Sequence, residues 1–254
     1  MGKVIAIVNQ KGGTGKTTTT VNVAYALASA GRKILCIDAD PQASLTFYMG
    51  HDERQLDQAK ATLYWALNSD QPLAEFVVGE NPALVPASIT LARADAELIS
   101  EPAASWVLKE KLDTLKSEYD LILIDCPPTL SLLTVNALAA ADTILIPVKT
   151  DLLSTLGVPQ LLDTVGKIQR RANPNLVILG IVPTLFNARF AHDAEVLMEL
   201  TTTFGRQFRL FNPIPRSTSF DRAAGSGRPT IMVEPDSAGA VAYRKLAAEL
   251  LEIL

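Results

Sequence analysis

Short apolar runs alternate along the chain with longer segments in which apolar residues recur every three or four positions. The short runs are typical of strands buried on both faces, and the longer segments are typical of amphipathic helices. Their alternation predicts βαβ units, in which helices join parallel strands. The predicted strands are residues 4–8, 33–37, 84–86, 121–124, 143–148 and 177–182, with a less regular seventh at 208–211.

Three helices have clear boundaries in the sequence. One covers residues 16–30 and ends at Gly31, a second covers 155–171 and stops before Pro174, and a third covers 238–254. No repeat, low-complexity tract or Gly/Ser linker separates the segments, and 254 residues suit one large α/β domain. We expect a single domain over residues 1–254, built as a doubly wound, mostly parallel sheet flanked by helices.

The composition fits a protein with a large buried core, because 48% of the residues are hydrophobic and 20% are charged. No run of 18 or more apolar residues occurs, and residues 1–8 lack the features of a secretory signal. Cys36 and Cys126 each lie inside an apolar run that predicts a buried strand, which disfavours a disulfide. A cytoplasmic location is therefore expected.

A glycine-rich loop joins the first predicted strand to the first predicted helix, which is the context of a phosphate-binding loop. Its glycines let backbone N–H groups turn toward one anion, and the helix start adds partial positive charge. Lys16 can then reach the β and γ phosphates, while the Thr17 hydroxyl can ligate Mg²⁺. The residues expected to hold the nucleotide here are Lys11, Gly12, Gly13, Thr14, Gly15, Lys16, Thr17 and Thr18.

Carboxylates follow two other predicted strands. Asp38 and Asp40 come after the strand at 33–37, where Asp40 could orient an attacking water and Asp38 could hold a metal-bound water. Either could instead only cap the helix that begins near Ala43. Asp125 ends the strand at 121–124, where an ionised carboxylate is costly unless Mg²⁺ and its waters pair with it. We therefore expect Thr17, Asp38 and Asp125 on the metal side.

The loop departs from the usual spacing G-x-x-x-x-G-K-[ST], because Gln10 stands where glycine is required and an additional lysine, Lys11, follows it. The run Lys-Gly-Gly-Thr-Gly-Lys-Thr-Thr resembles the deviant Walker A box of the ParA/MinD superfamily of P-loop NTPases. In that family two monomers sandwich two ATPs, and the signature lysine crosses to the partner's nucleotide. The resemblance implies an ATPase with ATP/ADP and Mg²⁺ as cofactors, an ATP-state homodimer, and Lys11, Lys16 and Asp40 as catalytic residues.

The resemblance covers nearly the whole chain and also implies where the base lies. The segment Pro213, Ile214, Pro215 and Arg216 looks like the family's adenine-side loop, with contacts mainly through backbone and packing. Asn187 follows the strand at 177–182 and is a second expected adenine contact. A plain turn asparagine is the alternative for Asn187.

Within the superfamily the chain looks most like the ParA/Soj-type partition ATPases. Their ATP-bound dimer binds DNA nonspecifically, and a ParB-like or adaptor protein triggers otherwise slow hydrolysis. The net charge is −4, yet residues 167–228 hold nine basic side chains against four acidic ones, a net charge of +5. Arg189, Arg216 and Arg222 are therefore the candidate DNA contacts, with solvated surface arginines as the alternative.

A nucleoid-associated cytoplasmic protein that segregates or positions cargo is the resulting expectation. The cargo stays open between a plasmid, a chromosome origin, a chemoreceptor cluster and a protein microcompartment such as a carboxysome. Three other functions occur on the same fold. A MinD-like membrane regulator would anchor through a basic amphipathic tail, a metal-cluster carrier would use bridging cysteines, and a tyrosine kinase would carry a tyrosine-rich tail.

None of the three fits the sequence well. The end of the chain has no basic face, and Ala238, Val241, Leu246 and Leu250 predict a helix packed on the body, so no membrane attachment is expected. Cys126 alone adjoins an expected site residue and no C-x-x-C occurs. The last fifteen residues hold one tyrosine, Tyr243.

Overall fold

A computed structural model describes residues 2–100 and 103–254 of the chain. Its centre is a six-stranded sheet in which every pair of neighbouring strands is parallel and the order is β3-β2-β4-β1-β5-β6. The six confidently delimited strands of the sequence are all confirmed, with ends that move by one or two residues. They are β1 (Lys3–Ile7), β2 (Ile34–Asp38), β3 (Ala83–Val85), β4 (Leu121–Asp125), β5 (Thr143–Lys149) and β6 (Val177–Thr184).

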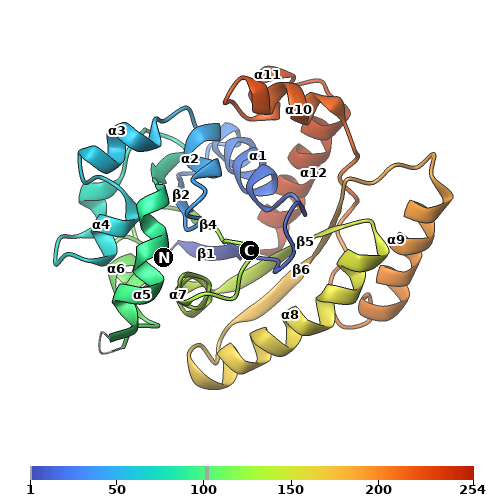
Figure 1. The fold of residues 1–254 in the computed structure, drawn as a ribbon. Helices are drawn as coiled ribbons and strands as arrows, with labels where there is room; N and C mark the ends of the chain where they lie inside the picture. Colours follow the sequence, from blue (N-terminus) through green and yellow to red (C-terminus); the bar gives the residue numbers. More distant parts are fainter. Residues whose placement is uncertain (1, 101–102) are drawn as a thin grey trace.

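Helices cover both faces of the sheet, which confirms the doubly wound α/β fold. Figure 1 shows α1 and α12 on one side of the strands and α7 and α8 on the other. The α helices are α1 (Lys16–Ser29), α2 (Ser44–Tyr48), α3 (Glu53–Gln58), α4 (Leu63–Leu67), α5 (Ala94–Glu97), α6 (Val107–Asp113), α7 (Leu132–Ala140), α8 (Leu152–Arg171), α9 (Ala191–Phe204), α10 (Thr218–Gly225), α11 (Thr230–Val233) and α12 (Ala238–Ile253). Short 3₁₀ turns cover Leu73–Phe76, Ile89–Arg93 and Leu98–Ser100.

The core forms two layers because successive strand residues point to opposite faces of the sheet. In β1, Ile5 and Ile7 pack with α1 and α12, whereas Val4 and Ala6 pack with α7 and α8. Complete burial of one such aliphatic side chain contributes about 1.5–3 kcal/mol. The same alternation places the two cysteines in different layers, and both thiols are free and buried.

The predicted seventh strand at 208–211 is wrong. This segment runs beside β6 but makes only a single parallel bridge, between Leu210 and Ile181. The Ile181 N–H donates to Arg209 O at 2.9 Å, and the Phe211 N–H donates to Ile181 O at 3.0 Å. Pro183 and Pro213 have no N–H to extend the ladder, so no continuous strand forms here. Backbone contact resumes where the Ile214 N–H donates to Pro183 O, followed by a second isolated parallel bridge between Phe186 and Pro215.

Two helix predictions need correction. Helix α8 begins at Leu152 rather than at residue 155, because the Asp151 carboxylate caps it by accepting from the Ser154 N–H. In α12, Leu246 and Leu250 are buried as expected, whereas Ala238 and Val241 are exposed. The buried face of α12 instead begins one to two positions later along the helix and contains Ala240, Tyr243 and Ala247. Within the described residues, no helix has both the length and the apolarity to cross a membrane.

Candidate functional site

The loop between β1 and α1 has the backbone form of an anion cradle. Gly13 and Gly15 adopt φ values of +70° and +83°, a left-handed conformation in which a side chain is strained. Gly15 is the N-cap of α1, no side chain caps this helix start in the described chain, and its first turn holds no acidic residue. The first N–H groups of α1 are therefore available to an anionic ligand, toward which the helix dipole is favourable.

This loop forms one wall of a pocket of about 390 Å³, within the usual range of about 300–1,000 Å³ for small-molecule sites. Every predicted loop residue from 12 to 18 lines the pocket, as do the predicted Asp40 and Ile214. Sequence reasoning missed the rest of the wall, which comes from α2, α10, α12 and the loops after β4 and β6. These residues are Ser44, Tyr48, Pro128, Thr184, Leu185, Phe220, Asp221, Ala224 and Tyr243.

Strand topology could have found one of these residues. Thr184 ends β6, and the carboxyl ends of parallel strands meet at one edge of a sheet, where ligands bind. Its hydroxyl donates to Thr14 O at 2.8 Å and so fixes the middle of the glycine loop. The contributions of Tyr48, Phe220 and Tyr243 come from helices whose docking no local pattern specifies.

Asp38 and Asp125 are register neighbours on β2 and β4, and both carboxylates are fully buried. The Asp38 carboxylate accepts from both the N–H and the hydroxyl of Thr46, at 2.8 and 2.7 Å. Burial and the neighbouring Asp125 raise the pKa of Asp38 to about 8, and the Thr46 bonds oppose this rise. Because Thr46 lies in the first turn of α2, the Asp38 carboxylate also holds the start of that helix, as its capping alternative requires.

Asp125 has one oxygen with a partner and one without. Its Oδ1 accepts from the Thr20 hydroxyl at 3.2 Å, whereas the buried Oδ2 has no hydrogen-bond partner in the described chain. Burial raises the pKa of Asp125 to about 7. The adjacent Thr17 hydroxyl and the positive charge of Lys16 oppose this rise. An unpartnered buried carboxylate oxygen costs free energy, and a nearby cation would remove that cost.

This donor set fits Mg²⁺ held together with phosphate. Mg²⁺ keeps several waters and takes one or two protein ligands beside substrate phosphates. No group of three or more His, Cys, Asp or Glu side chains gathers as a metal site within residues 2–100 and 103–254, so an all-protein cage is not part of this region. Thr17 lines the pocket and Asp125 lies behind it, which suits a cation held mainly by nucleotide and water.

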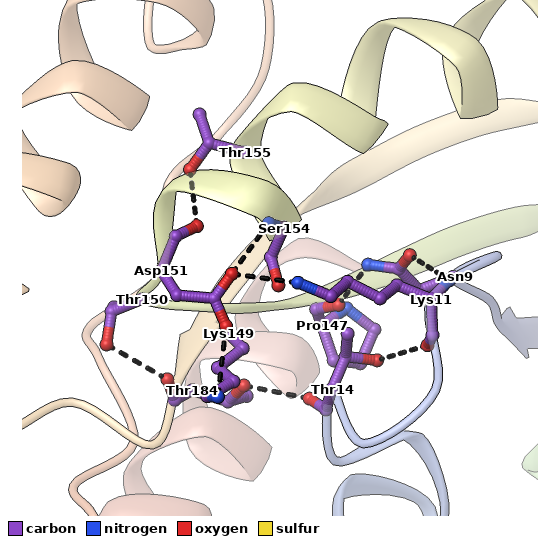
Figure 2. Close-up of polar contacts among 10 residues, drawn as sticks. All are labelled: Asn9, Lys11, Thr14, Pro147, Lys149, Thr150, Asp151, Ser154, Thr155 and Thr184. Carbon is purple, nitrogen blue, oxygen red and sulfur yellow. Dashed lines mark hydrogen bonds and ion pairs between the residues drawn. The ribbon is translucent and has the colours of Figure 1, made fainter.

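The two loop lysines point in different directions. The Lys16 ammonium is buried and donates to Lys11 O at 3.4 Å, across the loop. Burial lowers the pKa of Lys16, and the negative charge of Asp125 opposes this effect. The Lys11 ammonium instead donates to Asp151 Oδ1 at 2.9 Å, and Figure 2 shows its side chain extended toward the start of α8.

Asp151 thereby combines a helix cap with two ion pairs. Its Oδ1 accepts from the Ser154 N–H as well as from Lys11, and its Oδ2 pairs with Lys149 at 3.0 Å. Burial favours a raised pKa for Asp151, but the Lys11 and Lys149 ammoniums and the Ser154 N–H outweigh it and hold the pKa well below its usual range. Asn9 anchors the loop beside them by donating to Pro147 O and accepting from the Lys11 N–H.

The expected adenine-side residues form a second pair of adjoining loops. The Phe186 N–H donates to Ile214 O and the Arg216 N–H donates to Phe186 O, which holds residues 185–190 beside 213–216. Ile214 lines the pocket, whereas Asn187, Pro213, Pro215 and Arg216 do not border it. Asn187 Oδ1 accepts from the Arg189 N–H at 3.1 Å, so its side chain stabilises a turn in this structure.

The three candidate arginines have unequal surroundings. Arg189 and Arg216 are exposed, and neither is in an ion pair in the described part of the chain. Arg222 forms a bidentate ion pair with Glu234, with N–O distances of 2.5 and 2.7 Å. This pairing neutralises Arg222 and lowers its value as a contact for an external anion.

Comparisons with known proteins show which family the chain belongs to. Residues 2–178 match a family model described as an AAA domain. The chain is 39% identical to the sporulation initiation inhibitor protein Soj of Bacillus subtilis strain 168, with 98% of each chain covered. It is 37% identical to the chromosome partitioning protein ParA of Myxococcus xanthus strain DK1622, over 99% of this chain and 89% of that protein.

A solved structure resembles the whole fold. The cobyrinic acid a,c-diamide synthase of Mycobacterium smegmatis, with bound ADP and magnesium, superimposes with a TM-score of 0.86 at 35% identity, over 99% of this chain and 94% of that chain. A sheet ordered around β1, a deviant glycine loop and full-length similarity to Soj and ParA lead to one assignment. The chain belongs to the ParA/MinD superfamily and is a ParA-type P-loop ATPase.

Proposed function

We propose that residues 1–254 work as one domain that binds ATP or ADP with Mg²⁺ and switches its surface with the state of the nucleotide. The observation that supports this most strongly is the uncapped start of α1 facing a pocket, with the unpartnered Asp125 Oδ2 behind it. When bound, Mg²⁺ supplies positive charge to the phosphate oxygens. The protein supplies the N–H groups of the glycine loop, the Lys16 ammonium as a second cation, and Asp40 to position the attacking water.

The proposed roles follow the sequence prediction, and the residues that line the pocket have the most direct support. The N–H groups of residues 12–18 bind the phosphates, and the buried Lys16 ammonium neutralises their charge. Thr17, Asp38 and Asp125 hold the metal and its waters. Asp40, which also lines the pocket, orients the attacking water. The expected base contacts stay Asn187, Pro213, Ile214, Pro215 and Arg216, of which Ile214 has the most direct support.

Lys11 supports an ATP-dependent homodimer. Its side chain points out of its own pocket toward Asp151, so it stabilises no phosphate of its own protomer in this geometry. In a pair of facing protomers, Lys11 would leave Asp151 and contact the partner's nucleotide. ATP would thus complete an interface that ADP leaves incomplete, because the transferred phosphate carries the charge that the lysine meets.

The ATP-state dimer binds DNA without sequence preference, and a ParB-like or adaptor protein stimulates its slow hydrolysis. Arg189 and Arg216 support this proposal, because they project from adjoining loops and the dimer would double their number. Arg222 contributes less because Glu234 already holds it. One of the relatives is a chromosome partitioning protein, which favours segregation or positioning of cargo over the nucleoid as the use of this switch.

Nucleotide binding, dimerisation and hydrolysis can be separated with three variants. We expect the wild type to be monomeric with ADP and dimeric with a nonhydrolysable ATP analogue, as measured by light scattering after gel filtration. K16A should lose nucleotide binding, and K11A should bind ATP without dimerising. D40A should dimerise with ATP yet hydrolyse it about 100-fold more slowly, the effect of losing a general base. Unaltered ATP affinity in K16A would disprove the loop assignment.

A further inference from the structure

A row of polar contacts joins the glycine loop to the loop that carries Arg189. Its first member is Thr184, whose hydroxyl donates to Thr14 O in the glycine loop (Figure 2). The Thr184 carbonyl accepts from the Thr150 N–H at 3.1 Å. Thr14, Thr150 and Thr184 are all buried, so these bonds are shielded from competition by water.

Asp193 continues the row on the far side of Thr150. The Thr150 hydroxyl lies 3.1 Å from Asp193 Oδ2 and 3.3 Å from Thr184 O, and it has one hydrogen to donate. The carboxylate is the nearer and stronger acceptor, and Thr184 O is already satisfied by the Thr150 N–H. We therefore assign the hydroxyl hydrogen to Asp193.

The same oxygen of Asp193 holds the start of the Arg189 loop. Asp193 Oδ2 accepts from the Asn187 N–H at 2.8 Å, and Asn187 Oδ1 accepts from the Arg189 N–H. Asp193 lies in the first turn of α9 and is half-buried. Its carboxylate thus ties the backbone before Arg189 to Thr150, a residue of the β5–α8 junction.

Thr150 stands between Lys149 and Asp151, two residues of the ion-pair cluster that holds Lys11. Lys149 and Asp151 form an ion pair with each other, and Asp151 also holds the Lys11 ammonium. Alternation along the backbone places these two side chains on one side and Thr150 on the other. Any movement of Lys11 away from Asp151 changes the charges on one side of this three-residue junction, while Thr150 contacts Asp193 on the other.

We propose that Thr150 and Asp193 are positioning residues that couple the release of Lys11 from Asp151 to the orientation of the Asn187–Arg189 loop. This inference rests on the proposed function, in which Lys11 crosses to a partner's nucleotide and Arg189 contacts DNA. In this proposal, a shift of the junction at residues 149–151 moves the Thr150 hydroxyl. Asp193, which accepts from that hydroxyl, then shifts the Asn187–Arg189 loop. The coupling sets how strongly DNA affinity depends on the bound nucleotide.

Asp193 also has a local role, because an acidic side chain in the first turn stabilises the start of α9. Loss of DNA binding in D193A alone would therefore not distinguish coupling from a distorted loop. T150V removes only the hydroxyl and keeps the side-chain shape, and it leaves the Asp193–Asn187 bond in place. T150S keeps the hydroxyl and should behave as the wild type.

The experiment measures dissociation constants for random-sequence duplex DNA with ADP and with a nonhydrolysable ATP analogue. In T150V and D193A we expect near-wild-type affinity for the ATP analogue itself. The DNA dissociation constant with ADP, divided by that with the ATP analogue, should fall about tenfold, within the usual range of coupling between sites. The T150V/D193A double variant should lose no more than the larger single effect. T155V is a matched control, because Thr155 bonds Asp151 O at the same junction without contacting Asp193.

A second readout does not depend on DNA. Arg189 is exposed, and we expect the wild type to be cleaved by trypsin after Arg189 more slowly with the Mg²⁺–ATP analogue than with ADP. T150V should lose this nucleotide-dependent protection, and T150S and T155V should keep it. If the wild type does not bind DNA in any nucleotide state, the proposed DNA binding is wrong. The proteolysis then still tests whether Thr150 couples the nucleotide site to the Asn187–Arg189 loop. A T150V protein with wild-type protection, or an equal loss in T155V, would overturn the inference.

Discussion

Asp125 is a buried carboxylate whose two oxygens have unequal surroundings, and this asymmetry has a consequence for stability. Burial raises its pKa to about 7, while an unfolded aspartate titrates near 3.9. At pH values between these two pKa values, Asp125 keeps its proton in the folded protein and has lost it in the unfolded chain. The free energy of unfolding of the nucleotide-free protein must therefore fall as the pH rises through this window.

The first prediction is that D125N removes this fall in the free energy of unfolding at high pH. Asparagine keeps an oxygen for the Thr20 hydroxyl and cannot become negatively charged. At pH 8 we expect D125N to exceed the wild type by about 1–3 kcal/mol in free energy of unfolding, with the difference shrinking toward zero near pH 4. Chemical denaturation without nucleotide at several pH values measures this.

D163N serves as the control for D125N, because Asp163 is exposed on α8, where it forms an ion pair with Lys167. Its stability should follow the wild type at each pH. A D125N protein that is less stable than the wild type at pH 8, or a difference that does not change with pH, would contradict the titration assigned to Asp125.

The positions of some site residues follow from spacing, and the contacts of others do not. The glycine loop, Lys16 and Asp125 could be placed from sequence, because a strand end followed by glycines or a carboxylate implies the same chemistry in any parallel sheet. The bond from Thr46 to Asp38 and the pairing of Arg222 with Glu234 depend on how α2 and α10 dock. No local pattern specifies that docking.

Among the elements, the edge of the sheet at β6 is covered closely by residues 208–211, which do not form a strand. A methyl group added at Gly180 would lie 2.5 Å from Arg209 O and 2.7 Å from the Phe211 ring. The segment therefore lies against β6 at a distance that only glycine permits. Phe208 and Leu210 are half-buried and Phe211 is buried, but the sequence pattern cannot distinguish packing beside a strand from pairing with it.

The second prediction tests this close approach. G180A should lower the free energy of unfolding by about 1–3 kcal/mol, the usual cost of overpacking. G157A is the matched control, because Gly157 lies inside α8 and an added methyl group would meet no atom within 4 Å. G157A should be neutral or raise stability by about 0.5–1 kcal/mol. Equal effects of the two variants would contradict the packing described for β6.

Across the fold, alternation of strands and helices was sufficient to predict a doubly wound sheet. It could not give the strand order, because register and neighbours depend on long-range packing. That order puts β1 between β4 and β5, so the glycine loop, Asp125 and the Lys149–Asp151 junction meet at one edge. The signature lysine and the candidate DNA loop are thereby brought near a shared junction.

If nucleotide state controls a DNA-binding surface, as proposed, DNA affinity must depend on both the nucleotide and the salt concentration. The measurement is the affinity for random-sequence duplex DNA with ADP, with an ATP analogue and without nucleotide, over a salt series. R171A is the control, because Arg171 ends α8 about 30 Å from its start beside Asp151. We predict tight, salt-sensitive binding only with the ATP analogue, with a salt slope reduced by about 1 in R189A and in R216A, and less in R222A. Equal binding in all nucleotide states, or the same loss in R171A as in R189A, would contradict the account.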